Sequence, residues 1–227
     1  MAQAQPGLQD SLVTGYQRLA QDAPHRRIDF ELRALDILFS LLFGIVLLIP
    51  ALLIALVVRV TTGAPVLYRG ERVGRHGRFF SMLKFRTLKP GAEERIGQYL
   101  GEELVERTAA ELTRTGRWLK ASQLDEIPQL WNVLRGDMSF VGPRPIRARF
   151  FAELATELPA YWQRLVVRPG LTGFAQVRRG YETSMAEKLA HDLEWIADRS
   201  VPLYLRTLFS TGIRVLGQTF RGGSGST

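Results

Sequence analysis

The sequence predicts an α+β protein that is mostly helical, with a re-entrant membrane helix hairpin near the N-terminus, a small β-hairpin and interfacial amphipathic helices. Three observations lead to this prediction. Residues 37–58 form an uncharged apolar run that contains Pro50. Two short apolar runs, at 66–69 and 79–85, flank a glycine- and arginine-rich segment, as in a β-hairpin. Several later segments carry apolar residues at helical spacing.

The apolar run is long enough to cross a bilayer, but its flanks favour a return to the same side. It contains 22 residues between Asp36 and Arg59, about 33 Å as a straight helix, so length alone also fits one spanning helix. Arginines lie on both flanks, and the positive-inside rule places both in the cytoplasm. Pro50 removes a backbone donor and clashes with the preceding turn. We therefore expect residues 33–60 to enter the membrane, bend at Pro50 and return.

Composition excludes several kinds of site. The formal net charge of +8 fits nucleic acid, an anionic membrane surface or a phosphorylated substrate. The absence of cysteine excludes disulfides, thiol nucleophiles and cysteine-based zinc or iron–sulfur sites. With three histidines and no GxSxG string, neither a histidine-rich metal site nor a serine hydrolase is supported.

The remaining elements follow in chain order. Residues 1–32 are expected to form a weakly ordered arm, and residues 61–220 one cytoplasmic domain. The last helix has apolar residues opposite Arg206 and Arg214, which fits either a core helix or one lying on the membrane interface. Residues 221–227 resemble a linker or tag. Besides the β-hairpin, the patterns predict helices over 92–112, 127–135, 146–166, 185–198 and 202–220.

The most informative stretch contains the adjacent carboxylates Asp125 and Glu126. Ser122 and Asp125 have capping-box spacing and Pro128 suits a first helical turn, so the pair fits a helix N-terminus with no further role. The same position would keep Asp125 ionised, and an ionised carboxylate can attack phosphorus to form an acyl phosphate. Neighbouring residues do not share a helix face. One carboxylate can therefore face the substrate while Glu126 holds Mg²⁺, which binds carboxylates together with phosphate oxygens.

Basic residues beside turns and element ends provide candidate phosphate ligands, because arginine binds phosphate bidentately and lysine acts as a point charge. Each alone is most simply a solvated surface charge. Arg144 differs because Pro143 and Pro145 restrict the backbone on both sides, although the three residues also fit a rigid connector. The candidates are Lys84, Arg86, Arg117, Lys120, Arg144 and Arg168.

Several strings together resemble the bacterial sugar transferases, the monotopic polyprenyl-phosphate phosphoglycosyl transferases, in a minimal catalytic form. The match runs in order over residues 33–215, and the combination is specific although no single string is. Four positions depart from the family pattern, namely Ile49, Gly70, Arg178 and Tyr204. The matching strings are ERVG at 71–74, KFRT at 84–87, LDEIPQL at 124–130, NVLRGDMS at 132–139, VGPRP at 141–145 and RPGLTG at 168–173.

The resemblance implies a reaction. These enzymes (EC 2.7.8 type) transfer a sugar-1-phosphate from a UDP-sugar to undecaprenyl phosphate and release UMP, in the first membrane step of exopolysaccharide, O-antigen or capsule assembly. By the mapping, Asp125 is the nucleophile that forms a covalent phosphosugar intermediate, and Glu126 with Asp125 holds Mg²⁺. Arg144, between Pro143 and Pro145, would contact the nucleotide. The other substrate-binding candidates are Lys84, Arg86, Arg117 and Arg168.

The resemblance also implies partners and a location. The family sits on the cytoplasmic face of the bacterial inner membrane, held in the bilayer by a proline-broken re-entrant helix. A UDP-sugar and undecaprenyl phosphate are the expected partners; nucleic acid is not, and a homodimer is left open. Two other hypotheses stand beside this one. The first is a non-catalytic, membrane-anchored scaffold that binds polyanions. The second is a nucleic-acid binder, which no helix-turn-helix, RNP or zinc pattern supports.

Overall fold

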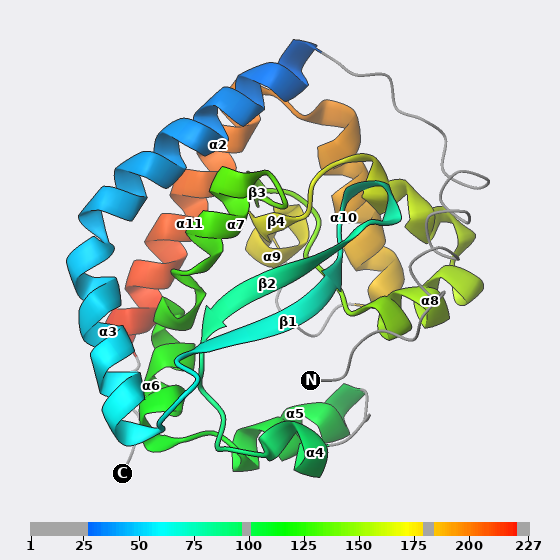
Figure 1. Ribbon diagram of the computed structural model, residues 1–227. Helices are drawn as coiled ribbons and strands as arrows, with labels where there is room; N and C mark the ends of the chain where they lie inside the picture. The colour runs from blue at the N-terminus through cyan, green and yellow to red at the C-terminus, as the bar shows by residue number, and fades with distance from the viewer. Residues whose placement is uncertain (1–26, 97–100, 179–183, 222–227) are drawn as a thin grey trace.

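The computed structural model describes residues 27–96, 101–178 and 184–221. Most of the N-terminal segment predicted to be weakly ordered (residues 1–32) and nearly all of the predicted tail (residues 221–227) lie outside these ranges. The architecture is mostly helical α+β with a small β-hairpin, as predicted. In Figure 1, two consecutive helices form a bent arm along one side of the molecule, the hairpin crosses the middle, and further helices pack behind and opposite the arm.

The bent arm consists of α2 (Arg27–Val46) and α3 (Leu48–Thr61), whose axes differ by 63°. The break falls at Leu47, three residues before the predicted position. Pro50 lies in the first turn of α3, where its missing N–H costs little, and its ring would clash with the carbonyl four residues earlier. The proline therefore bends the chain in the turn that precedes it. In the part of the chain that the structure describes, no single helix has both the length and the apolar composition needed to span a membrane. The two helices of this bent pair together have that length and composition.

The β-hairpin pairs β1 (Leu67–Val73) with β2 (Phe79–Phe85) in antiparallel register, from Leu67 opposite Phe85 to Val73 opposite Phe79. The first strand is longer than predicted and includes Gly70, which the sequence analysis left in the loop. The hairpin was correctly located because its two apolar runs and intervening glycines give a strong local signal.

The predicted helix over residues 92–112 is two shorter helices, α4 (Ala92–Ile96) and α5 (Gly101–Ala110). An unpredicted helix, α6 (Arg114–Ser122), follows. The Thr113 hydroxyl accepts a hydrogen bond from Gly116 N at 2.8 Å and so caps this helix. Under α3, a small apolar cluster joins Ile54 and Val58 to Phe85 and Leu119, with Leu124 and Ile127 packed against it.

The main core lies between α2 and the C-terminal half of the chain. It includes the large buried side chains Phe151, Tyr161, Trp162 and Tyr204. Two three-residue strands in this half pair in parallel and were not predicted. Besides these strands, β3 (Ser139–Val141) and β4 (Gly170–Thr172), the half contains α7 (Gln129–Arg135), α8 (Ala148–Glu157), the 3₁₀ segment η3 (Pro159–Val166), α9 (Phe174–Arg178), α10 (Met185–Asp198) and α11 (Val201–Arg221).

A buried carboxylate on α2 joins the arm to this core. Asp36 is 2% exposed, and its Oδ1 accepts hydrogen bonds from Ser139 Oγ at 2.9 Å, Phe140 N at 3.0 Å and Tyr204 Oη at 2.9 Å. A buried carboxylate is costly unless hydrogen bonds compensate for its lost hydration. Asp36 therefore holds β3 and α11 against α2.

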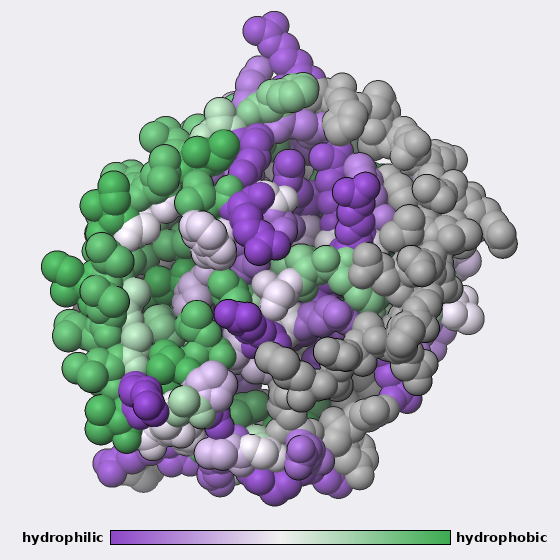
Figure 2. Space-filling model, in the orientation of Figure 1, coloured by the Kyte–Doolittle hydropathy of each residue, from purple (hydrophilic) through white to green (hydrophobic). Residues whose placement is uncertain are grey.

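The outer face of the arm is apolar. Figure 2 shows hydrophobic side chains gathered over α2 and α3, beside a hydrophilic central region. The last helix, α11, has one buried side and one exposed apolar side. Tyr204 and Thr207 are buried, whereas Leu205, Phe209 and Ile213 are exposed. Among the side chains whose burial the structure describes, the large exposed apolar residues of the three helices are Phe30, Ile37, Leu38, Leu41, Leu42, Ile45, Val46, Leu48, Ile49, Leu52, Leu53, Leu56, Val57, Val60, Leu205, Phe209 and Ile213.

The substitution Tyr204→Phe tests the role of Asp36. It removes one of three donors to a buried carboxylate and should lower the free energy of unfolding of the purified protein by about 1.5–3 kcal/mol. Phe209→Leu, on the exposed side of the same helix, serves as the control and should have little effect. Equilibrium denaturant unfolding measures both. An unchanged stability of Tyr204→Phe would contradict the proposed link between α2 and α11.

Candidate active site

The carboxylate pair lies in a short 3₁₀ turn, η2 (Leu124–Glu126), between α6 and α7. The predicted capping box is wrong. Ser122 ends α6, and its hydroxyl donates to Trp118 O at 2.9 Å and to Leu119 O at 3.2 Å. Gln123 adopts the left-handed conformation with φ of 58°, which terminates α6 and starts the turn. The hydrophobic neighbours of this turn, described above, hold it against α3.

Lys84 on β2 lies opposite both carboxylates. Its Nζ is 2.6 Å from Glu126 Oε1 and 4.0 Å from Asp125 Oδ2. Asp125 is 6% exposed. Burial raises the pKa of Asp125 from 3.8 to about 6, Lys84 opposes that shift, and the neighbouring Glu126 adds to it. We expected a helix N-terminus to keep Asp125 ionised, but loss of hydration is the larger effect and raises its pKa. At neutral pH the carboxylate is still mostly ionised, and it is poorly hydrated.

Asn132 on α7 positions Lys84 and was missed by the sequence analysis. Its side chain is 2% exposed; Oδ1 accepts from Leu83 N at 2.9 Å, and Nδ2 donates to Ser81 O at 2.8 Å. These bonds tie β2 to the helix that follows the carboxylate turn. The strand residue next to Leu83 is Lys84, so Asn132 sets the position of the lysine relative to Asp125. An asparagine inside a helical pattern gives no local signal of such a long-range bond.

Three other predicted cations lie on elements next to the carboxylate turn or to β2, namely Lys120 and Arg117 on α6 and Arg86 directly after β2. Lys120 is exposed on α6, and its charge lowers the pKa of Asp125. Arg86 links the loop before β1 to the segment after β2, because its Nη1 donates to Ala64 O at 2.8 Å and its Nε to Leu88 O at 3.3 Å. Arg117 is exposed on α6. The structure therefore brings Lys84 and Lys120 to the carboxylates, while Arg86 contacts the surrounding backbone.

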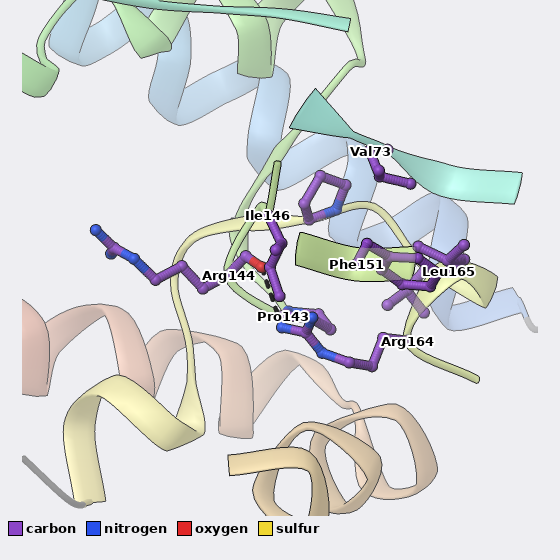
Figure 3. Close-up of a pocket in the computed structure, with 10 residues that line it drawn as sticks. Val73, Pro143, Arg144, Ile146, Phe151, Arg164 and Leu165 are labelled. Atoms are coloured by element: carbon purple, nitrogen blue, oxygen red, sulfur yellow. Dashed lines mark hydrogen bonds between the residues drawn. The ribbon is translucent and has the colours of Figure 1, made fainter. Parts of the chain in front are cut away.

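A buried arginine of η3, Arg164, fixes the backbone of the Pro143-Arg144-Pro145 loop. Arg164 donates through Nη2 to Arg144 O at 3.0 Å, through Nε to Asp192 Oδ2 at 2.7 Å, and through Nη1 to Tyr161 Oη at 2.9 Å. Arg164 and Asp192 are both almost fully buried. In Figure 3, the Arg144 side chain extends away from the other residues of the small pocket, whereas Arg164 reaches its carbonyl. Arg144 is thus presented outward from a fixed backbone.

Arg168 lies at the other end of α7 from the carboxylates. Its Nε donates to Gly136 O at 2.9 Å, and Arg33 donates to Val133 O at 2.6 Å and Leu134 O at 2.7 Å. The seven residues of α7, about 10 Å along the helix axis, separate this end from the carboxylate turn. Burial lowers the pKa of Arg168, as do the charges of Arg33 and Arg75. The structure therefore does not bring Arg168 to the carboxylate pair.

Comparison with known proteins agrees with the geometry. Residues 29–218 match the family model of the bacterial sugar transferases. The chain belongs to this family.

Curated relatives of this sugar transferase carry related names. The chain is 34% identical over 186 residues to the UDP-N-acetylgalactosamine-undecaprenyl-phosphate N-acetylgalactosaminephosphotransferase of Aeromonas hydrophila. The alignment covers 80% of this chain and 43% of the relative. It is 39% identical over 175 residues to the UDP-glucose:undecaprenyl-phosphate glucose-1-phosphate transferase of Xanthomonas campestris pv. campestris, covering 74% and 35%. A Caulobacter vibrioides protein of the same name is 37% identical over 194 residues, covering 82% and 71%. The chain thus matches less than half the length of the first two relatives.

The raised pKa of Asp125 predicts that this carboxylate destabilises the folded protein at neutral pH. The folded state must hold a buried charge above pH 6, whereas the unfolded chain titrates near 3.8. Asp125→Asn should therefore stabilise the protein at pH 7.5 by up to about 3 kcal/mol, and the gain should shrink as the pH falls through 6 and disappear below about 4.

Urea unfolding of both proteins at pH 7.5, 6 and 4 measures the difference. Leu124 and Ile127 are unchanged in this variant, so the turn keeps its apolar contacts. A variant that is less stable than the parent at pH 7.5, or a gain that does not depend on pH, would contradict the inferred desolvation.

Proposed function

We propose that this sugar transferase moves a sugar-1-phosphate from a UDP-sugar to undecaprenyl phosphate and releases UMP. The observation that carries the proposal is the buried Asp125, held next to Glu126 and opposite Lys84, in a chain of this family. The names of the relatives supply the donor and acceptor classes. This reaction would be the first membrane step in the assembly of a surface glycan.

The proposed reaction has two halves with Asp125 as the nucleophile. Its carboxylate oxygen attacks the phosphorus that bears the sugar; a new O–P bond forms, the bond to the bridging oxygen breaks, and the electron pair leaves with UMP. An oxygen of undecaprenyl phosphate then attacks the same phosphorus, and Asp125 leaves as a carboxylate. The low hydration of Asp125 favours the attack, because little water must be displaced. Lys84 Nζ lies where it can offset negative charge on the phosphate oxygens.

The carboxylate pair fits a Mg²⁺ ion that arrives with the diphosphate. Within residues 27–96, 101–178 and 184–221 no group of three or more acidic or histidine side chains could hold a metal alone. Mg²⁺ commonly uses one or two carboxylates and completes its shell with phosphate oxygens and water. Glu126, with Asp125, would supply the protein ligands, and the bound ion would neutralise diphosphate charge. Arg144, presented outward between Pro143 and Pro145, would contact the nucleotide.

The arm is proposed to lie in the bilayer as a re-entrant hairpin, with the catalytic residues on the cytoplasmic face of the bacterial inner membrane. Its outer side is apolar along both helices, and with both helices at a shallow angle to the membrane plane the 63° bend would return the chain to the side from which it entered. The exposed apolar residues of α11 would rest on the membrane interface. Asp36 and Arg33 would stay on the protein side of α2, in contact with the core.

A UMP-release assay over a panel of UDP-sugars, with undecaprenyl phosphate and Mg²⁺, tests the reaction. The parent protein should release UMP with at least one donor, Asp125→Asn should reduce turnover by several orders of magnitude, and Glu126→Gln should weaken the dependence on Mg²⁺. Full turnover by Asp125→Asn would exclude Asp125 as the nucleophile. A parent protein that releases no UMP from any donor would favour the polyanion-binding scaffold.

Single-cysteine labelling tests the re-entrant hairpin, since the chain has no cysteine of its own. Ser11→Cys and Thr62→Cys place one thiol on each side of the apolar run. In intact cells, both should resist a membrane-impermeant maleimide and react only after lysis. Labelling of Ser11→Cys from outside would show that the segment spans the membrane.

A further inference from the structure

The end of β1 brings three arginines together beside the Pro143-Arg144-Pro145 loop. Val73 forms an antiparallel bridge with Ile146, and Val73 N donates to Ile146 O at 3.0 Å. In antiparallel register, the residue before Val73 lies opposite the residue after Ile146. Arg72 is therefore the cross-strand neighbour of Arg147, and Arg144 belongs to the loop that leads into this bridge.

A glycine lets Arg72 turn back along its strand toward the carboxylates. A Cβ atom at Gly70 would lie 2.9 Å from Arg72 Nη1 and 2.7 Å from Tyr68 Cε1, so both side chains occupy the space above this glycine. The Arg72 Nη1 also donates to Glu71 O at 2.7 Å. Gly70 is one of the positions that depart from the family pattern, and its missing side chain makes this arrangement possible.

The register places this guanidinium close to the proposed reaction centre. Tyr68 pairs with Lys84, and Gly70 pairs with Met82, so the four residues share one face of the hairpin. Two residues along a strand correspond to about 7 Å. The Arg72 guanidinium, above Gly70, therefore lies roughly 7 Å along the hairpin from the level of Lys84.

The three arginines lack the acidic partners that other arginines of this chain have. Arg95, Arg164 and Arg178 each form an ion pair with a carboxylate. Among the residues that the structure describes, no carboxylate forms an ion pair with Arg72, Arg144 or Arg147.

Like charges placed opposite each other destabilise a strand pair. Burial lowers the pKa of Arg72; the Tyr68 side chain opposes that shift, and the charges of Arg147 and Arg144 add to it. An anion bound among the three arginines would remove this repulsion.

We propose that Arg72 and Arg147 join Arg144 in a clamp for the phosphate of the nucleoside monophosphate, the part of the donor that leaves as UMP. This inference rests on the proposed function. Guanidinium groups bind phosphate oxygens in pairs, which suits a group that gains negative charge as it leaves. The clamp would hold the nucleotide phosphate while Lys84 and Asp125 act on the phosphorus that bears the sugar.

Direct binding of UMP and of uridine to the purified protein tests the clamp without requiring turnover. Arg147→Gln and Arg72→Gln should each weaken UMP binding about tenfold or more, since each removes charge-assisted hydrogen bonds to the phosphate. Uridine, which lacks the phosphate, should bind each variant within about twofold of the parent. Arg69→Gln, on the other face of β1, and Arg149→Gln, on α8, are matched controls and should bind UMP like the parent. Arg147 is exposed, so its variant provides the test if Arg72→Gln does not fold.

The possible outcomes separate this inference from the proposed function. Unchanged UMP binding in Arg147→Gln, or an equal loss of UMP and uridine binding, would overturn the clamp. Binding of farnesyl phosphate, a short prenyl phosphate that stands in for the lipid acceptor, is measured with the same variants. A loss of farnesyl phosphate binding with UMP binding intact would also overturn the clamp, because the arginines would then serve the lipid acceptor. If the parent binds UMP through these arginines but releases none from any UDP-sugar, the clamp stands and the proposed reaction fails.

Discussion

The buried carboxylate of Asp36 is the constraint on which the arrangement of the site depends. It needs three hydrogen bonds to compensate for its lost hydration, and they come from β3 and α11. One turn earlier on α2, Arg33 binds the last carbonyls of α7. The same helix thus fixes β3, which leads into the Arg144 loop, and α7, which follows the carboxylate turn. Both halves of the candidate site take their position from one face of α2.

Charge is handled in two ways around the site. Where position must be held, buried charges are fully partnered, as in the pair of Arg164 and Asp192 beneath the Arg144 loop. Where a substrate would bind, compensation is incomplete: the nearby Lys84 and Lys120 do not offset the lost hydration of Asp125, and Arg72 lies among other arginines. Functional sites commonly concentrate such perturbed groups. A diphosphate with its Mg²⁺ would supply the missing charges of both signs.

The sequence predicted the features that depend on local patterns. The hairpin, the boundaries of α10 and the end of α7 at Gly136 follow from strand patterns, helical spacing and a left-handed glycine. It did not predict β3 and β4, because three-residue strands have no periodicity to detect. The capping box at Ser122 failed because the same residue types also occur at helix ends, and Gln123 turned the chain. The placement of Arg168 and the role of Asn132 depend on contacts between distant segments, which one sequence does not reveal.

In the reaction that we propose, Asp125 becomes covalently linked to the phosphosugar. Intact-protein mass spectrometry, after mixing the protein with a turnover-competent UDP-sugar and Mg²⁺ but no acceptor, tests it most directly. We expect a mass increase equal to one sugar-phosphate group, located on the peptide that contains Asp125 and lost when undecaprenyl phosphate is added. A protein that turns over rapidly yet never carries this adduct, or carries it on another residue, would contradict the account.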